Sequence, residues 1–96
     1  MGGPVRRLKV TAETAALVRS LHPHLKKKVK AALQTILHDT LAGKALRDEL
    51  EGLRSFRVGR IRIIYRLAGR EVVEVVAVGP RRTIYEETLR LLSKEK

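Results

Sequence analysis

Arginine is concentrated in the stretch "SFRVGRIRIIYRL", residues 55–67, whose two apolar-polar halves around a Gly-Arg pair are typical of a β-hairpin. Successive side chains of a strand point to opposite faces of a sheet, so the second half has an apolar face and a basic face. The apolar face has Ile61, Ile63, Tyr65 and Leu67, and the basic face has Arg60, Arg62, Ile64 and Arg66. Because a guanidinium group donates in a planar fork that suits phosphate oxygens, the basic face is a candidate phosphate-binding surface.

The first half of the hairpin continues this division. Phe56 is expected to face the core and Ser55 and Arg57 the charged side, and strand pairing would bring Arg57 near Arg62. Residues 54–82 contain eight of the chain's thirteen arginines, two acidic residues and no lysine. Like charges at such density repel one another, so phosphate recognition is favoured. A solvated sheet face without a ligand is the alternative.

A second set of polar residues lies in "VGPRRTIYEE", residues 78–87. Its Gly-Pro pair is predicted to end a strand, and Arg81 and Arg82 follow. Tyr85 is expected in the first turn of the last helix. An arginine here could bind a phosphate or stabilise a charged transition state, and the tyrosine could stack on a base or transfer a proton. An aromatic residue at the edge of the core is the simpler interpretation of Tyr85.

A strand and two helices are predicted before the hairpin. Residues 5–10 favour a short first strand. Thr11 can cap a helix that continues through Leu21, and Pro23 suits the first turn of a second helix. Apolar side chains recur at helical spacing on one face of this second helix. They are Leu25, Val29, Ala32, Leu33, Ile36 and Leu37. Residues 39–52 are expected to form a connection with about one helical turn.

Three strands are predicted at residues 53–58, 61–67 and 72–78, and a last helix at residues 83–93. Short turns between the strands predict an antiparallel meander. The third strand is almost wholly apolar and is therefore expected to be central, with both faces covered. The sum is an α+β fold in a single domain, residues 1–96. The first two helices are expected to pack on one face of the sheet and to leave the other face available.

Composition restricts the partners and the kind of site. The formal charge is +11, from 21 basic and 10 acidic residues, which favours a polyanionic partner such as a nucleic acid. With no cysteine, and with His22, His24 and His38 at spacings unlike those of metal ligands, neither a metal site nor a cofactor is predicted. No apolar run approaches the roughly 20 residues of a membrane helix, and the N-terminus lacks the apolar core of a signal peptide. A cytoplasmic protein without a membrane partner is expected.

The stretch "GKALRDELEGLRSFRVGRIRIIYRL" and the later "VVAVGPRRTIYEE" resemble the RelE/ParE superfamily of toxins from toxin–antitoxin systems, and most closely its RelE branch. The resemblance covers nearly the whole chain and is most specific at the arginine-bearing hairpin and at the glycine, arginine and tyrosine that follow. It implies a small RelE-like domain and a toxin of a type II pair. It further implies a ribosome-dependent endoribonuclease, an mRNA interferase that cleaves mRNA in the A site and inhibits translation. The implied partners are a cognate antitoxin, the ribosome and mRNA.

The resemblance also implies roles for individual residues. The catalytic residues would be Arg57, Arg62, Arg81 and Tyr85. They would serve attack of a ribose 2′-hydroxyl on its own 3′-phosphate, which leaves a cyclic phosphate and requires no metal. Contacts to RNA and the ribosome would come from Arg54, Arg60, Arg66, Arg82, Lys26, Lys27, Lys28 and Lys30. The chain departs from the family pattern at Gly59, where a second basic residue is usual, and Arg60 is the nearest substitute.

Two other functions fit many of the same residues. A ParE-like inhibitor of DNA gyrase would share the fold; the pair Arg81 and Tyr85 argues against it, and Gly59 argues for it. A non-enzymatic RNA-binding module would need only the phosphate contacts. The lysines at residues 26–30 are explained equally well by ribosomal RNA contact and by a solvated helix face.

Overall fold

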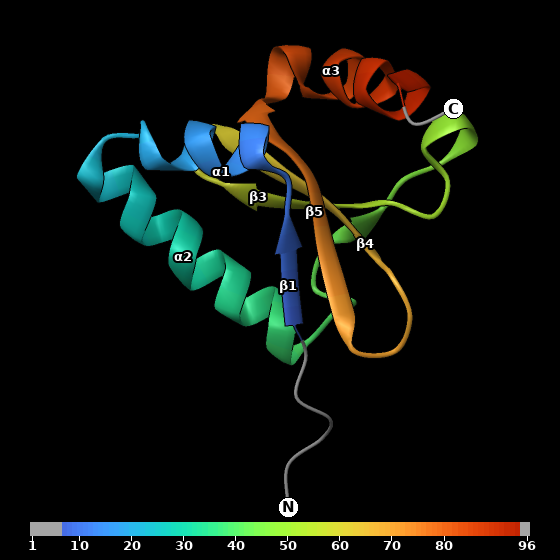
Figure 1. Cartoon of the computed structure of the whole chain (residues 1–96), viewed down its shortest axis with the longest axis horizontal. Coiled ribbons are helices and arrows are strands. Elements are labelled where there is room, and N and C mark those ends of the chain that lie inside the picture. The colour runs from blue at the N-terminus through green and yellow to red at the C-terminus, as the bar shows by residue number, and fades with distance from the viewer. Residues whose placement is uncertain (1–6, 95–96) are drawn as a thin grey trace, which may run out of the picture.

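The computed structural model describes residues 7–94, apart from the side chains of residues 81, 82 and 94. The elements are β1 (Arg7–Val10), α1 (Ala12–Arg19), α2 (Pro23–His38), β2 (Lys44–Ala45), the 3-10 helix η1 (Asp48–Leu50), β3 (Arg54–Val58), β4 (Ile61–Leu67), β5 (Val72–Pro80) and α3 (Arg81–Lys94) (Figure 1). The predicted order of strand, two helices, three strands and helix is confirmed. The helical turn expected in the connection is η1, whereas the short strand β2 was not predicted. Residues 5 and 6 of the predicted first strand lie outside the described residues.

The ends of α1 follow from local hydrogen bonds. The Oγ1 atom of Thr11 accepts a hydrogen bond from the backbone N–H of Thr14 at 3.1 Å, so Thr11 caps the helix as predicted. Glu13 lies in the first turn, where a negative charge is favoured by the helix dipole. The helix ends at Arg19, two residues before the predicted Leu21.

One face of α2 packs against the sheet. The helix begins at Pro23, where the N–H that proline lacks has no partner within the helix in any case. Val29, Ala32 and Ile36 are buried, each three or four residues from the next. Leu33 and Leu37 are partly buried against the same cluster. The predicted apolar face of this helix is confirmed.

The sheet has five strands in the order β1-β5-β4-β3-β2. β1 runs parallel to β5, and the other neighbouring pairs are antiparallel. β5 was predicted to be the central strand. It is an interior strand with residues 75–78 buried, but the middle strand of the sheet is β4. The Gly-Pro pair does not end β5 at residue 78, because Gly79 pairs opposite Arg62 and Pro80 opposite Ile61. The last helix accordingly begins at residue 81 and not at residue 83.

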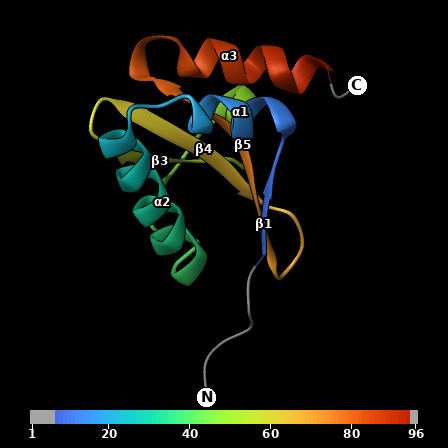
Figure 2. The ribbon, with the colours of Figure 1, turned by 60° about the vertical axis from the view of Figure 1, so that its left-hand side comes forward.

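Two apolar clusters cover opposite faces of the sheet. The first includes Val29, Ile36, Ile63, Tyr65 and Val75, and the second includes Leu53, Ile64, Val76, Ala77 and Ile84. α1 and α2 contribute to the first cluster and α3 to the second, so the helices lie on both sides of the sheet (Figure 2). The prediction that one face stays available is wrong, because the apolar side chains of β4 and β5 on that face are covered by α3.

The β3–β4 turn consists of Gly59 and Arg60, as predicted. Gly59 has a φ angle of +59°, and glycine is favoured as the first central residue of such a two-residue hairpin turn. Any other residue would be strained at this φ. The geometry of the turn therefore accounts for a glycine where the resemblance implies a basic residue.

Candidate functional site

Arg57 of β3 and Arg62 of β4 lie directly opposite each other. In the same ladder Ser55 lies opposite Ile64, which belongs to the cluster beneath α3. Because alternate residues of a strand share a face, both arginines point to the side of the sheet that α3 partly covers. The predicted proximity of the two arginines is confirmed.

An open pocket of about 210 Å³ lies at the turn end of the β3–β4 hairpin. Its lining residues are Arg57, Gly59, Arg60, Ile61 and Arg62. Within the described residues, none of the three arginines forms a salt bridge. Three guanidinium groups without an acidic partner create a positive potential that attracts anions, and phosphate in particular accepts from such groups.

Arg62 is the most constrained of the three. Its side chain is partly buried, and Nη1 donates to Oγ of Ser55 at 3.4 Å. Its Nε is buried and has no acceptor among the described residues. By contrast, Arg57 is exposed and donates from Nε to the backbone carbonyl of Gly59 at 3.3 Å, within its own turn. Arg62 thus has one buried donor for which the described part of the chain supplies no acceptor.

The start of α3 packs closely on the strand next to Arg62. Gly79, opposite Arg62 in β5, is buried, and a Cβ atom at this position would lie 3.2 Å from Cδ1 of Ile84. That distance is tighter than an ordinary carbon contact, so a side chain at Gly79 would require the Ile84 side chain to move by a few tenths of an ångström. The start of α3 therefore packs closely on β5 beside the arginine pair.

The two other predicted catalytic residues are carried by α3. Arg81 is the first residue of the helix and follows Pro80, which pairs opposite Ile61, so its backbone lies at the pocket end of β4. Tyr85 is in the second turn and not the first, and it is partly buried against the second apolar cluster. The fold therefore brings the helix start and the arginine pair to the same end of the sheet.

Arg54 and Arg66, predicted to contact RNA, have acceptors within the protein. Arg54 donates from Nε to the carbonyl of Gly43 at 2.9 Å and from Nη2 to the carbonyl of Leu41 at 3.2 Å. Arg66 donates from Nε to the carboxylate of Glu74, its cross-strand neighbour, at 2.6 Å. Both arginines are located at the end of the hairpin away from its turn.

The predicted ribosome-binding lysines lie on the other layer of the molecule. Lys27, Lys28 and Lys30 are exposed and Lys26 is partly exposed, all in the first half of α2. Figures 1 and 2 show the start of α2 on the same side of the molecule as the β3–β4 turn. The lysines and the arginine pair thus lie on opposite faces of the sheet. Both groups are near the end of the sheet that has the β3–β4 turn.

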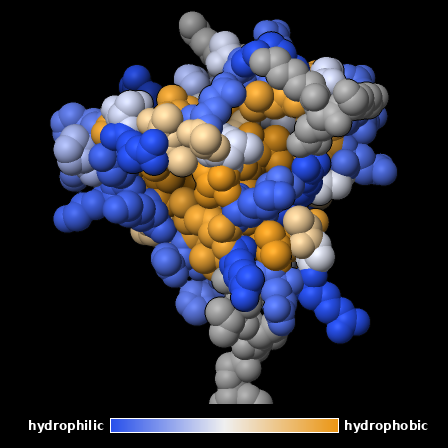
Figure 3. Space-filling view, viewed as in Figure 1, coloured by the Kyte–Doolittle hydropathy of each residue, from blue (hydrophilic) through white to orange (hydrophobic). Residues whose placement is uncertain are grey.

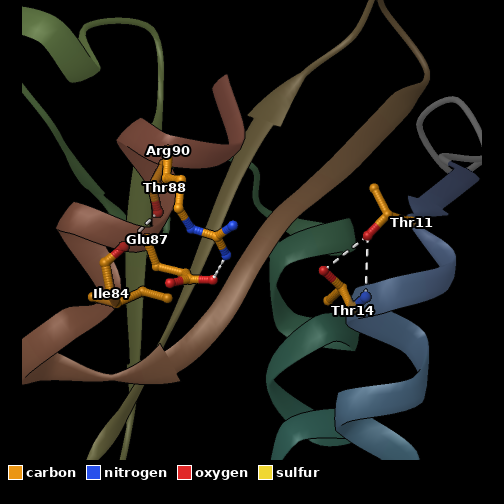
Figure 4. Close-up of polar contacts among 6 residues, drawn as sticks. All are labelled: Thr11, Thr14, Ile84, Glu87, Thr88 and Arg90. Atoms are coloured by element: carbon orange, nitrogen blue, oxygen red, sulfur yellow. Dashed lines mark hydrogen bonds and ion pairs between the residues drawn. The ribbon is translucent and has the colours of Figure 1, made fainter. Parts of the chain in front are cut away.

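A separate apolar groove of about 430 Å³ lies between α1, β5 and α3. Its lining includes Leu17, Ala77, Val78 and Leu91, and Figure 3 shows apolar residues gathered in the middle of this view. The polar contacts drawn in Figure 4 are local: the N-cap Thr11 contacts Thr14 of α1, and within α3 Thr88 contacts Ile84 and Glu87 contacts Arg90. The hydrogen bond to Glu87 raises the pKa of Arg90. This groove shares no lining residue with the arginine pocket.

Comparison with known families identifies the chain. A family model described as the ParE toxin of type II toxin–antitoxin systems matches residues 7–85. The chain is a member of the ParE toxin family. This toxin has the RelE-like fold of the RelE/ParE superfamily, as expected from the hairpin and the "GPRRTIY" stretch. A comparison with curated proteins gave no match.

Solved structures with similar folds include a toxin and toxin–antitoxin complexes. The RelBE2 toxin–antitoxin complex from Mycobacterium tuberculosis has a chain 27% identical, with a TM-score of 0.70 over 81% of this toxin and 100% of that chain. A mutant of E. coli RelE in the free state is 18% identical, with a TM-score of 0.75 over 96% and 98%. YafQ from E. coli is 17% identical, with a TM-score of 0.63 over 81% and 96%. The latter two likenesses concern the fold alone.

Two structural absences hold for the described part of the toxin. Residues 7–94 contain no group of three or more His, Cys, Asp or Glu side chains placed to hold a metal ion. None of the helices described is both long enough and apolar enough to cross a membrane.

Sequence reasoning missed the residues that position the arginines. Ser55 was assigned to the charged face, but its bond to Arg62 was not foreseen. The signal was a small polar residue between Arg54 and Phe56, on the strand face that carries Arg57. The partners of Arg54 had no such signal, because they are backbone carbonyls eleven and thirteen residues away.

Proposed function

We propose that this toxin is a ribosome-dependent endoribonuclease that cleaves mRNA in the ribosomal A site and thereby inhibits translation. The observation that carries the proposal is the directly opposed pair Arg57 and Arg62 in a pocket whose lining includes no acidic residue. The RelE-like fold supports it, whereas the match to the ParE toxin family keeps the ParE-like function as the second candidate. The substrate would be the phosphodiester of a single-stranded messenger, whose phosphate is a natural acceptor for two guanidinium groups.

The reaction is attack of a ribose 2′-hydroxyl oxygen on the adjacent 3′-phosphorus. The new O–P bond forms as the bond to the next nucleotide's 5′-oxygen breaks, which leaves a 2′,3′-cyclic phosphate. The 2′-proton is removed and the 5′-oxygen is protonated. Arg57 and Arg62 stabilise the additional negative charge on the phosphorane, and Arg81 serves the leaving group. The metal-free character of this route is part of the proposal.

Proton removal is the difficult step for such a site. A guanidinium has a pKa above about 12 and is a poor base at neutral pH. We assign orientation of the target nucleotide, and assistance in removing the 2′-proton, to Tyr85. Tyr85→Phe would keep the packing of the ring against the second cluster. A strong loss of cleavage in this variant supports the proton role, whereas full cleavage would leave stacking as the role of this residue.

Binding to the ribosome would use the remaining cations at this end of the molecule. Arg60 lines the pocket, and Arg82 follows Arg81 in α3. The lysines at residues 26–30 would contact ribosomal RNA from the opposite layer. We assign bracing of the fold to Arg54 and Arg66 in place of RNA contact, because they already donate to carbonyls and to a carboxylate.

A cognate antitoxin belongs to the same proposal. The formal charge of +11 and the arginine pocket would favour an antitoxin with an acidic segment that covers the basic surface. Such a segment would neutralise the groups that bind phosphate, and the toxin would be inactive in the complex.

The decisive experiment is primer extension on mRNA bound to programmed ribosomes. It compares the wild type with Arg62→Ala and Arg81→Ala, each with and without a chelator. Cuts in the A site that resist the chelator and disappear in both variants support the proposal. The matched control is Arg47→Ala, an exposed arginine outside the pocket, which should cut like the wild type.

The same purified proteins distinguish the alternatives. Intact mRNA together with inhibition of DNA supercoiling by gyrase would select the ParE-like function. Stable binding to ribosomes without any cut would select a non-enzymatic binding module. Either result would contradict the nuclease proposal.

A further inference from the structure

Ser55 is a buried polar residue beneath the proposed site. It is 3% exposed and is the second residue of β3. It pairs opposite Ile64, which in turn lies opposite Ala77, so its neighbours on the β4 and β5 side are apolar, whereas on the β2 side it pairs opposite the exposed Lys44. A hydroxyl in such surroundings is unfavourable unless it has a hydrogen-bond partner. Its Oγ accepts a hydrogen bond from Nη1 of Arg62 at 3.4 Å.

We propose that Ser55 is a positioning residue for Arg62, an inference that rests on the proposed function. In a guanidinium group, Nε and Nη2 form the side-on pair of donors that binds a carboxylate or phosphate, and Nη1 lies on the other side. A bond from Nη1 to Ser55 therefore fixes the group while it leaves this fork unoccupied. The Nε of Arg62 is indeed without an acceptor in the described part of the chain.

A serine suits this position because its hydroxyl is an uncharged partner for Arg62. Arg66, four residues further along β4, donates to the carboxylate of Glu74, which neutralises its charge. A hydroxyl orients a guanidinium but leaves the full positive charge for the substrate. The bond to Ser55 is the one hydrogen bond that the Arg62 side chain makes within the described residues. Removal of this hydroxyl would let the guanidinium adopt several orientations.

The kinetic test separates positioning from packing. We expect Ser55→Ala to lower the single-turnover cleavage rate at saturating toxin about tenfold and to leave the half-saturating concentration nearly unchanged. Ser55→Thr keeps the hydroxyl and should restore most of the rate. The matched control is Thr88→Val, which removes a fully buried hydroxyl that donates to the carbonyl of Ile84 at 2.7 Å. Equal loss of rate in Ser55→Ala and Thr88→Val would overturn the proposal.

A double mutant tests whether Ser55 acts through Arg62. In the Arg62→Ala background there is no guanidinium to position, so Ser55→Ala should produce no further loss. A further loss of the same tenfold size would show that Ser55 acts independently and would overturn the proposal.

A measurement on the protein alone separates this inference from the nuclease proposal. In a sample with 15N-labelled arginine, the Nε–H signal of Arg62 is identified by its disappearance in Arg62→Lys, and inorganic phosphate is then titrated. We expect this signal to shift with phosphate in the wild type, and to be broadened and less responsive in Ser55→Ala. That result supports the positioning role even if the wild type leaves mRNA intact, in which case only the nuclease proposal fails. An Arg62 signal unchanged by Ser55→Ala would overturn the positioning role.

Discussion

The two ends of the β3–β4 hairpin use the same residue type in opposite ways. At the turn, Arg57, Arg60 and Arg62 line a pocket without an acidic residue. At the other end, Arg54 and Arg66 donate to backbone carbonyls and to a carboxylate. The difference lies in the acceptors that the surrounding chain provides and not in the arginines themselves. An arginine is a candidate for ligand binding where the fold leaves its donors unused.

The end of the hairpin that carries Arg54 and Arg66, the braced end, is held by a connected network of hydrogen bonds. The connection after α2 passes close to the sheet at Gly43, where a Cβ atom would lie 2.7 Å from the Oη of Tyr65. The Tyr65 hydroxyl donates to the carbonyl of Thr40 at 2.8 Å and accepts from the N–H of Gly43 at 2.9 Å. Arg54 donates to two further carbonyls of the same connection. Polar groups at this end stabilise the fold, whereas the arginines at the turn end are the candidates for phosphate recognition.

Exchange of one arginine at each end should separate activity from stability, and it gives the largest expected effect. Arg62→Ala is expected to lower A-site cleavage about 100- to 1,000-fold, because it removes a donor to the transition state. Arg66→Ala should leave the rate per folded molecule nearly unchanged and lower the free energy of unfolding by about 1–3 kcal/mol, since Glu74 loses its closest partner. Primer extension and urea denaturation measure the two quantities. Equal losses of cleavage in both variants would remove the distinction between the ends.

Much of the fold was predictable because its signals are local. Thr11 and Pro23 mark helix starts, and the period of Val29, Ala32 and Ile36 marks a buried helix face. The opposed arginines followed from the alternation of two strands around a two-residue turn at Gly59. Each of these features depends on residues within a few positions of one another.

The remainder depends on contacts between distant segments. The placement of α3 over the second face is set by Ile84 against residues of β4 and β5, and no short pattern specifies it. β2 is two residues long and exists through its pairing with β3. A register shift at Ile64 and Tyr65 also changes how β4 meets β5. The partners of Arg54 and Arg66, and hence the division of the arginines into two groups, were therefore beyond a reading of the sequence.

Charge reversal on α2 tests whether the basic surface at the turn end of the hairpin continues onto the opposite layer of the molecule. Its effect on ribosome binding should be smaller than the effect of Arg62→Ala on cleavage. Replacement of Lys27, Lys28 and Lys30 by glutamate is expected to weaken ribosome binding by on the order of tenfold or more at low salt and to flatten its salt dependence. Binding measured across a salt series gives the slope. Unchanged affinity and slope would show that these lysines form a solvated helix face. The free energy of unfolding should change little, since all three side chains are exposed.

Removal of one hydroxyl tests the network at the braced end. Tyr65→Phe leaves the Gly43 N–H and the Thr40 carbonyl without their partner and is expected to lower the free energy of unfolding by about 1–3 kcal/mol. Cleavage by the folded fraction should remain close to that of the wild type. Urea denaturation measures the first quantity and primer extension the second. A variant with normal stability and reduced cleavage would contradict the assignment of this end to the fold.

The smallest expected effect concerns Arg54, which is partly buried at the braced end. Arg54→Met keeps much of the apolar stem but loses the donors to the carbonyls of Gly43 and Leu41, so the free energy of unfolding should fall by about 1 kcal/mol. The matched variant Arg47→Met changes an exposed arginine without such acceptors in the described residues and should leave stability unchanged. Both lose one positive charge, so any non-specific loss of ribosome affinity should be equal in the two. A larger loss of affinity in Arg54→Met, with stability intact, would restore Arg54 as an RNA contact and extend the ligand-binding surface along the whole hairpin.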